Sequence, residues 1–381
     1  MDGGIYDSDH EDFRDAVGEF LRREVWPRTD ELIAGHTIPR DLWLTAGRQG
    51  LLGLEVPEEY GGSAANDYRY NAVLIEELAK VSMALASSFS IHFDVVAAYL
   101  VTMTTEEQRA RWLPSFATGE SVTAIAMTEP SAGSDLAALR TRAERTGDGW
   151  VLNGSKTFIT NGYSADLVVV AARSTPGTRS KGITLFGAES TRPGFARGRK
   201  LDKVGQPEAD TAELYFQDLR LPEENVIGTV DRGFVHMMNG LPQERLGSAV
   251  ANLAHARQIL TETLEYAKER HAFGAPIGSF QHNKFLLADL YTRIEVTQAY
   301  VDRCVMAHTH QALTAIDAAK AKWWTAQVQN EVIDHCLQLH GGYGYMNEQR
   351  VGRAWRDARI TKIWAGSNEI MKELIGRDLG L

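Results

Sequence analysis

The chain has 381 residues and a formal net charge of −10, with a hydrophobic share of 44% and a charged share of 24% that are ordinary for a globular protein. Its length exceeds one minimal core and predicts two or three packed subdomains. The acidic balance argues against a nucleic-acid surface, because phosphate binding needs clustered lysine and arginine.

Targeting and metal signals are missing from the sequence. The longest apolar runs, such as residues 165–172, are too short to cross a membrane, and residues 1–9 are too acidic for a secretory or transit peptide. The two cysteines, Cys304 and Cys336, lie in segments of helical pattern and are expected to be small buried hydrophobes. No cysteine and histidine cluster suits zinc. We therefore expect a metal-free, cytoplasmic protein.

The first two zones of the chain differ in periodicity. Residues 1–120 carry apolar side chains at three- and four-residue steps, which predicts an all-helical domain. Residues 121–231 contain short β-branched runs separated by turn pairs such as Asn153-Gly154. Since no helix of useful length fits between these runs, an antiparallel barrel or sandwich is favoured over a βαβ sheet.

Helical periodicity returns in the third zone, residues 232–381. Long apolar stripes cover residues 248–270, 280–311 and 315–339 with few interruptions by proline or glycine. Helices of this length, close together in sequence, predict an antiparallel bundle. The expected fold class is α+β, in the order α, β, α.

Common catalytic signatures are absent. The sequence has no dinucleotide-binding Gly-x-Gly-x-x-Gly after a strand, no P-loop, no Gly-x-Ser-x-Gly elbow and no His-Glu-x-x-His. Hydrolase and nucleotide-triphosphatase functions are therefore disfavoured.

Two clusters in the β zone suit a planar, anionic ligand. Residues 126–135 form a loop of small residues whose hydroxyls and open backbone amides allow close approach of such a ligand. In residues 154–162, Phe158 and Thr160 share one side of a strand, so the ring can stack on a heterocycle while the hydroxyl bonds its edge. Taken alone, the loop could be a simple connection and Phe158 a core residue.

Two further clusters lie in the helical third zone. Arg270, near Phe273 and Gln281, either binds a phosphate or complements the dipole of the preceding helix. Gly341 and Gly342 follow Gln338 and either end a helix or allow a ligand close to the backbone.

These clusters, together with residues 364–370, stand in the order and spacing typical of acyl-CoA dehydrogenases, and the chain resembles that family over essentially its whole length. The resemblance implies an N-terminal helical domain (1–120), a middle β-domain (121–231) and a C-terminal four-helix bundle (232–381). It also implies one FAD per subunit, a homotetramer in which a neighbouring subunit helps to hold the adenine end, an acyl-CoA substrate, and an electron-transfer flavoprotein as acceptor.

The resemblance assigns the cofactor contacts residue by residue. The flavin ring and pyrophosphate are expected against Met127, Thr128 and Ser134, and the isoalloxazine against Phe158 and Thr160, although many relatives have tryptophan where Phe158 stands. The phosphates and adenosine are expected to contact the remaining matches: Arg270, Phe273, Gln281, Gln338, Gly341, Gly342, Ser367 and Glu369.

The catalytic base is the chief departure from the commonest family pattern. Those members carry a carboxylate immediately before the glycine matching Gly366, where this chain has Ala365. Long-chain and isovaleryl-type relatives supply the base from the helix that opens the C-terminal domain, and Glu244 matches that position. An arbitrary helical glutamate is more often exposed and paired with a cation, but the vacancy at Ala365 favours Glu244 as the base.

The resemblance also places the substrate. It implies that the thioester carbonyl accepts a hydrogen bond from the Ala365 N–H, that Arg245 contacts the CoA portion, and that Ser134 and Gly366 border the substrate. Two rivals remain. One is an oxidase, a monooxygenase or a carrier-protein thioester dehydrogenase of the same fold; the other is a non-enzymatic helical scaffold. Acyl length, CoA versus carrier protein, the acceptor, and dimer versus tetramer are left open.

Overall fold

Local capping signals define the helices of the N-terminal region. The computed structural model describes residues 4–381, and residues 1–3 of the acidic N-terminal segment lie outside the described residues. Asp67 and Ser82 accept backbone N–H bonds at the starts of two helices, and Thr105 forms a capping box with Gln108. The helices are α1 (Ser8–Phe20), α2 (Thr29–Gly35), α3 (Arg40–Arg48), α4 (Tyr68–Val81), α5 (Met83–Ser90), α6 (Ala97–Met103) and α7 (Glu106–Ala117), with the π-helical turn η4 (Ile91–Val96) joining α5 to α6.

The continuous helical stretch Met83–Met103 is apolar. By length and composition it could cross a membrane, with a mean hydropathy of 1.5, but 72% of its most apolar window is buried inside the protein. Its side chains pack in the core between the N-terminal helices, the sheet and the bundle.

The middle region forms one connected sheet of eight strands. They are β1 (Thr123–Ala126), β2 (Arg142–Thr146), β3 (Gly149–Thr160), β4 (Leu167–Arg173), β5 (Ile183–Glu189), β6 (Phe195–Lys200), β7 (Thr211–Pro222) and β8 (Val226–Ile227). The order is β6-β7-β3-β2-β4-β5-β8, with β1 beside β4. Only short 3₁₀ turns separate these strands, as the sequence predicts.

Two strand pairs depart from the expected antiparallel pattern. Strands β1 and β2 both pair parallel to β4, whereas the other pairings are antiparallel. Parallel neighbours need a long connection. The loop of residues 127–141 and the β2–β3 hairpin provide that length between β1 and β4.

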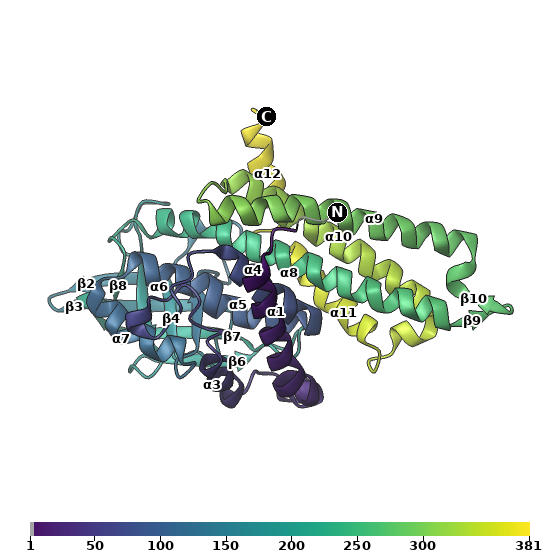
Figure 1. Ribbon diagram of the computed structural model, residues 1–381. Coiled ribbons are helices and arrows are strands. Elements are labelled where there is room, and N and C mark those ends of the chain that lie inside the picture. Colours follow the sequence, from purple (N-terminus) through teal and green to yellow (C-terminus); the bar gives the residue numbers. More distant parts are fainter. Residues whose placement is uncertain (1–3) are drawn as a thin grey trace.

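The C-terminal region is built on three long helices. These are α8 (Gly233–Glu269), α9 (Gln281–Thr309) and α10 (Ala315–His340), followed by α11 (Arg350–Ala358) and α12 (Asn368–Asp378). Figure 1 shows the three long helices side by side, reaching away from the sheet to a tip formed by the short strands β9 (His271–Ala272) and β10 (Ala275–Pro276). Cys304 and Cys336 are free and buried here, which confirms their predicted core role.

Helix α8 begins well before the apolar stripe of residues 248–270. It runs without interruption from Gly233, close to residue 232, where the sequence predicts that helical structure returns. Gly240 and Pro242 interrupt the apolar pattern at its beginning. Proline removes only one backbone donor, and a long helix packed on both sides tolerates that loss. Residue 244 therefore lies well inside a helix.

A buried ion pair joins residues 126–135 to strand β3, the two clusters of the β-domain that the sequence predicts to face a ligand. Lys156, which is fully buried on β3, donates to Glu129 Oε1 at 2.8 Å and to the Met127 carbonyl at 3.1 Å. The Thr157 N–H also donates to the Thr128 carbonyl at 3.0 Å. The loop of residues 126–135 is thereby fixed against the end of β3.

Replacing Lys156 by methionine is expected to lower the free energy of unfolding by about 3–5 kcal/mol, because it leaves the buried Glu129 carboxylate without its cation. Chemical denaturation of the purified protein measures the change. Lys268→Gln, which removes a solvent-exposed partner of Glu265, is the matched control and should change stability by less than about 1 kcal/mol. Equal effects of the two variants would contradict the structural role of the buried pair.

Candidate active site

Glu244 is held in a polar niche beside α6. The Tyr99 hydroxyl donates to Glu244 Oε1 at 3.2 Å, and the carboxyl group is partly buried. Gly240 makes this contact possible, since a Cβ atom there would lie 2.7 Å from the Tyr99 hydroxyl oxygen. Burial raises the pKa of Glu244 to about 7, while the Tyr99 hydrogen bond and the nearby Arg245 charge oppose that rise. A carboxylate in this state suits general-base work near neutral pH.

The loop between η9 (Arg359–Lys362) and α12 carries Ala365 and Gly366. Both have positive φ, +51° and +88°, so the backbone makes a sharp left-handed turn there. A Cβ atom on Gly366 would come 2.6 Å from Met371 and 3.8 Å from a terminal guanidinium nitrogen of Arg245. Arg245, the residue that follows Glu244, therefore lies against the loop that contains Ala365.

The turn is held by a buried lysine. Lys322 of α10 has no exposed surface, and its ammonium donates to the Gly366 carbonyl at 2.6 Å. Burial and the Arg245 charge lower the pKa of Lys322 to about 7. Within residues 4–381 the Ala365 N–H donates to no backbone or side-chain acceptor. It is thus free to donate to a ligand oxygen, and its role toward the thioester carbonyl stays a prediction.

Arg245 is buried, and its Nε atom has no hydrogen-bond partner within the described chain. A buried guanidinium donor without an acceptor is costly unless a ligand supplies one. This agrees with a substrate contact for Arg245. Ser367, which follows Gly366 in the sequence, caps α12 by accepting from the Ile370 N–H at 3.4 Å. Glu369 is exposed in the first turn of the same helix.

Phe158 is presented to solvent in an unusual backbone conformation. It lies at an irregularity in the β3–β7 pairing, with φ at +59°, and 69% of its surface is exposed. An aromatic residue with positive φ is strained and exposed apolar surface is unfavourable, so the position fits a ring that stacks on a planar ligand. Thr160 is partly buried beyond it, Met127 is buried, Thr128 is partly buried, and Ser134 is exposed.

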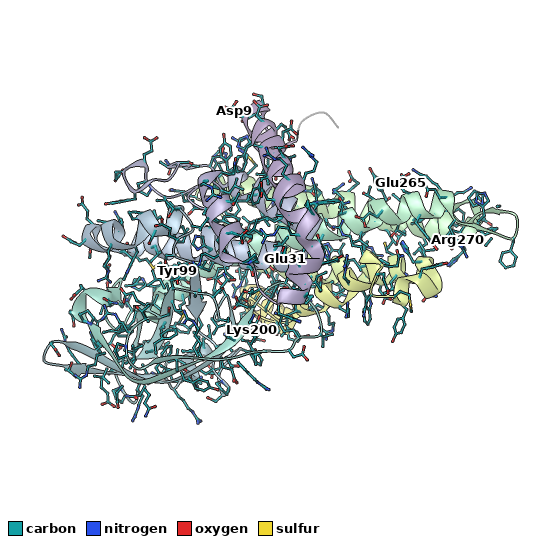
Figure 2. The ribbon with its side chains drawn as sticks, turned by 90° about the horizontal axis from the view of Figure 1, so that it is seen from below. Asp9, Glu31, Tyr99, Lys200, Glu265 and Arg270 are labelled. Carbon is teal, nitrogen blue, oxygen red and sulfur yellow. The ribbon has the colours of Figure 1, made fainter. Side chains whose placement is uncertain are left out.

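A second part of the predicted cofactor site lies at the tip of the bundle. A cavity of about 480 Å³ is lined by Arg270, Gly341 and Gly342 together with Tyr266, Ile277, Leu339, His340, Tyr343 and Met346. Around this tip Phe273 is 99% exposed, and Gln281 and Gln338 are exposed. Figure 2 shows Arg270 at the far end of the long helices from Tyr99. The structure therefore groups the predicted residues into two sites rather than one.

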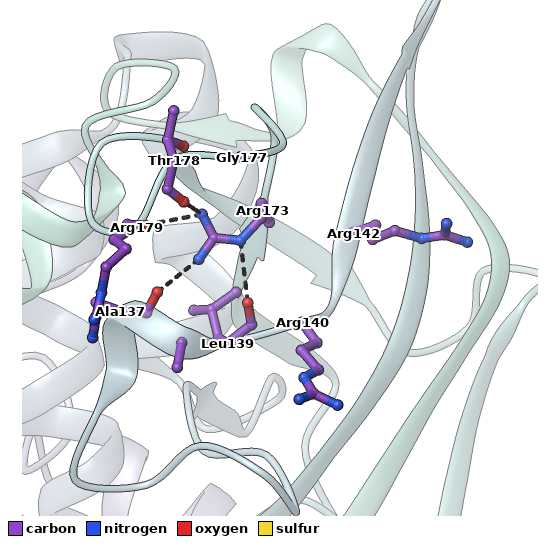
Figure 3. A pocket seen from close by; sticks show the side chains of 9 residues that line it. Ala137, Leu139, Arg140, Arg142, Arg173, Gly177, Thr178 and Arg179 are labelled. Atoms are coloured by element: carbon purple, nitrogen blue, oxygen red, sulfur yellow. Dashed lines mark hydrogen bonds between the residues drawn. The ribbon is translucent and has the colours of Figure 1, made fainter.

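An arginine-lined cavity of about 490 Å³ lies beside β2, outside the predicted residues. At its centre Arg173 donates to the carbonyls of Ala137, Leu139, Thr178 and Arg179 (Figure 3). These bonds tie two loops together. Arg173 is therefore a structural residue, with four of its five N–H donors bound to backbone carbonyls.

Sequence reasoning missed two residues of the site, Tyr99 and Lys322. Lys322 leaves a signal, because it stands in one helical row with the buried residues Ala318, Thr325 and Gln329. A lysine on a core-facing stripe requires a buried acceptor. Tyr99 leaves no such signal, since an apolar row accepts tyrosine readily.

Comparison with known proteins finds relatives that match nearly the whole chain. Models of the acyl-CoA dehydrogenase N-terminal, middle and C-terminal domains match residues 7–120, 124–219 and 231–380. The long-chain specific acyl-CoA dehydrogenase of Sus scrofa, a mitochondrial protein, is 43% identical over 98% of this chain and 87% of its own length.

Two solved structures are also similar. An acyl-CoA dehydrogenase from Geobacillus kaustophilus has a TM-score of 0.97 and 43% identity, covering 99% of each chain. A chain from a structure of the electron transferring flavoprotein of Acidaminococcus fermentans has a TM-score of 0.95 and 36% identity, covering 100% of this chain and 99% of that chain.

The matching domains and relatives thus place the chain in the flavoprotein class of oxidoreductases. The chain belongs to the acyl-CoA dehydrogenase family, whose members depend on FAD.

Tyr99→Phe is expected to move the acidic limb of the pH profile of kcat/KM upward by roughly one pH unit. The hydroxyl donates to ionised Glu244, so its loss favours the protonated form, which cannot act as a base. Steady-state kinetics with an acyl-CoA between pH 5.5 and 9 measures the shift. Tyr163→Phe, at an exposed tyrosine on the β-domain, should leave the limb in place, and a limb unmoved in Tyr99→Phe would contradict the contact.

Proposed function

We propose that Glu244 removes the α-proton of an acyl-CoA thioester while the Ala365 N–H donates to the thioester carbonyl oxygen. One observation carries this proposal. The Glu244 carboxyl group is held by Tyr99, while the loop position at which the commonest relatives carry a carboxylate is occupied here by Ala365. Arg245 connects the two, lying next to Glu244 in sequence and against Gly366 in space. The product is the trans-2-enoyl thioester.

The chain's own residues account for the proton step. An α C–H is a weak acid, so its removal needs both a base and stabilisation of charge on the carbonyl oxygen. Glu244 is positioned by Tyr99, and the Ala365 N–H by the Lys322 bond to the Gly366 carbonyl. FAD, when bound, supplies the acceptor for the β-hydride. Phe158 and the Met127–Thr128 segment fit its ring.

The proposed substrate is a long straight-chain acyl-CoA, and the proposed acceptor is an electron-transfer flavoprotein. The 43% identity with a long-chain specific enzyme over nearly the whole chain supports the first assignment. The likeness to a chain in an electron transferring flavoprotein structure supports the second. Neither assignment depends on the position of the base.

Glu244→Gln is expected to retain FAD but to lose acyl-CoA oxidation by a factor of roughly 10²–10⁴, the usual contribution of a well-placed base. The variant keeps the size of the side chain and its contact with Tyr99. Bleaching of the flavin near 450 nm under anaerobic conditions by palmitoyl-CoA, and separately by isovaleryl-CoA, measures the loss. Palmitoyl-CoA should be the better wild-type substrate.

A rescue variant sharpens this test. Glu244→Gln combined with Ala365→Glu restores a carboxylate at the position used by the commonest relatives, on a backbone already at positive φ. Partial recovery is expected only if the original loss was that of a base. Near wild-type turnover in the single variant would sink the assignment of Glu244.

We also propose that the active unit is a homotetramer. In it, the tip of one subunit binds the adenosine end of an FAD whose flavin ring lies in another subunit. Glu244 and Arg270 are separated by 26 residues of α8, roughly 39 Å at 1.5 Å per residue. One dinucleotide does not span that distance. The Arg270 cavity therefore serves a cofactor whose flavin end lies in a second copy of the chain.

Phe273→Asp is expected to weaken subunit association and FAD retention together, because it places a charge on a fully exposed apolar side chain at the tip. Light scattering after size exclusion gives the mass, and the ratio of absorbance at 450 nm to that at 280 nm gives the FAD content. Phe273→Tyr should preserve both. A tetramer that keeps its FAD in Phe273→Asp would contradict the shared site.

A further inference from the structure

A cluster of buried polar groups lies directly beneath the helical turn of Glu244. Asn71 Nδ2 donates to Glu55 Oε1 at 2.9 Å and to Asp94 Oδ1 at 3.1 Å. Gln243 Nε2 donates to the same two oxygens, at 3.2 and 3.0 Å, and to the Asp94 carbonyl at 3.0 Å. Two carboxyl groups thus share two amide donors, one of which belongs to the residue next to Glu244.

Glycines on α8 let this cluster approach the helix. Gly240, Glu244 and Gly247 are spaced by four and three residues and so share one helical face. A Cβ atom on Gly247 would lie 2.6 Å from Asp94 Oδ2, just as one on Gly240 would meet Tyr99. On this face Glu244 therefore lies between two glycines. The Tyr99 hydroxyl fills the space beside Gly240, and the Asp94 carboxyl group fills the space beside Gly247.

No cation pairs with these two carboxyl groups within residues 4–381. The groups that face them are Tyr68 and Asn71 from α4 and Gln243 from α8, and Tyr68 donates to Asp94 Oδ2 at 3.5 Å. His308 of α9 packs on the Tyr68 ring at 4.4 Å, and burial lowers its pKa to about 4, so it is neutral. His92, on the same turn as Asp94, is also neutral and bonds the Phe116 carbonyl and Thr123.

Two unpaired carboxylates cannot both ionise in such a space. Burial raises the pKa values of both Glu55 and Asp94, and the Asp94 charge raises that of Glu55 further, to about 8. Within residues 4–381, Asn71 Oδ1 is a buried acceptor without a hydrogen-bond partner. The pair therefore keeps one proton and carries one negative charge at neutral pH.

We propose that Asp94 is a positioning residue for the base, which anchors the Glu244 turn through Gln243 and keeps a negative charge beside it. This inference rests on Glu244 as the base. The remaining groups around Glu244 are Tyr99 from α6 and Arg245 from α8, both of which favour its ionised form. Burial opposes them most strongly, and the Asp94 charge acts in the same direction as burial. That charge strengthens the carboxylate as a proton acceptor, which a weakly acidic α C–H requires.

Asp94→Asn tests the proposal, because it keeps the shape and the acceptor for both amides but removes the charge. The acidic limb of kcat/KM is expected to move downward by roughly half to one pH unit. At pH 6 the variant should therefore retain a larger fraction of its own maximal kcat/KM than the wild type retains of its maximum. Glu55→Gln is the matched control, since it mimics the protonated partner and leaves Asp94 charged. Its limb should stay in place or move upward.

A purely structural role predicts a different pattern, in which both variants lose activity or stability without opposite effects on the limb. A limb that is unmoved in Asp94→Asn, or moves equally in both variants, overturns the proposal. FAD absorbance and thermal melting check folding. If Asp94→Asn does not fold, Gly247→Ala displaces the carboxyl group instead and should move the limb in the same direction.

The activity of Glu244→Gln, measured in parallel, separates the role of Asp94 from the assignment of Glu244 as the base. An active Glu244→Gln overturns both this inference and the assigned base. An inactive Glu244→Gln with an unmoved Asp94→Asn limb overturns this inference alone.

Discussion

The continuity of α8 is the constraint on which the rest of the structure depends. One unbroken helix carries Glu244 near its start and ends where Arg270 enters the tip of the bundle. A helix is stiff over this length, so Glu244 and Arg270 keep a fixed separation of roughly 39 Å at 1.5 Å per residue. The proposed assembly of subunits rests on that rigidity, because it would let the two ends contribute to one FAD from different copies of the chain.

The same helix makes close polar contacts because parts of its surface are bare. Each glycine inside a helix costs about 1 kcal/mol relative to alanine. At Gly240 and Gly247 this cost is offset by room for the Tyr99 hydroxyl and the Asp94 carboxyl group. The two contacts act on the Glu244 proton in opposite directions, since a donated hydrogen bond stabilises the carboxylate and a neighbouring negative charge destabilises it. The basicity of Glu244 on α8 thus depends on two groups of the helical stretch Met83–Met103 that packs against it.

Much of the fold was readable from the sequence, and the reasons are local. Periodicity predicted the α, β, α order, and the turn pairs predicted strands without intervening helices. The apolar stripe of α8 was recognised only from residue 248 because Gly240 and Pro242 break the pattern, whereas packing on both sides keeps the helix intact from Gly233. The parallel pairing of β1 and β2 with β4 was missed because register depends on contacts distant in sequence.

The site was readable only in part, for a similar reason. Glu244, Ala365 and Phe158 lie in biased local runs that a resemblance can match. Tyr99 and the Glu55–Asp94 pair come from segments whose residues look unremarkable singly, and only folding brings them against α8. Their effect on Glu244 depends on distance and burial, which no linear pattern records.

The arrangement also explains how a base can change position without loss of the rest of the site. In the proposed reaction the thioester oxygen accepts from the Ala365 N–H, and that donor depends on the left-handed turn at Ala365 and on the Lys322 bond to the Gly366 carbonyl. Neither feature requires a side chain longer than a methyl group at residue 365. The base, in contrast, needs only to reach one proton from any direction that the pocket leaves open. Because the donor and the base belong to different elements, α8 can supply the carboxylate while the loop keeps its geometry.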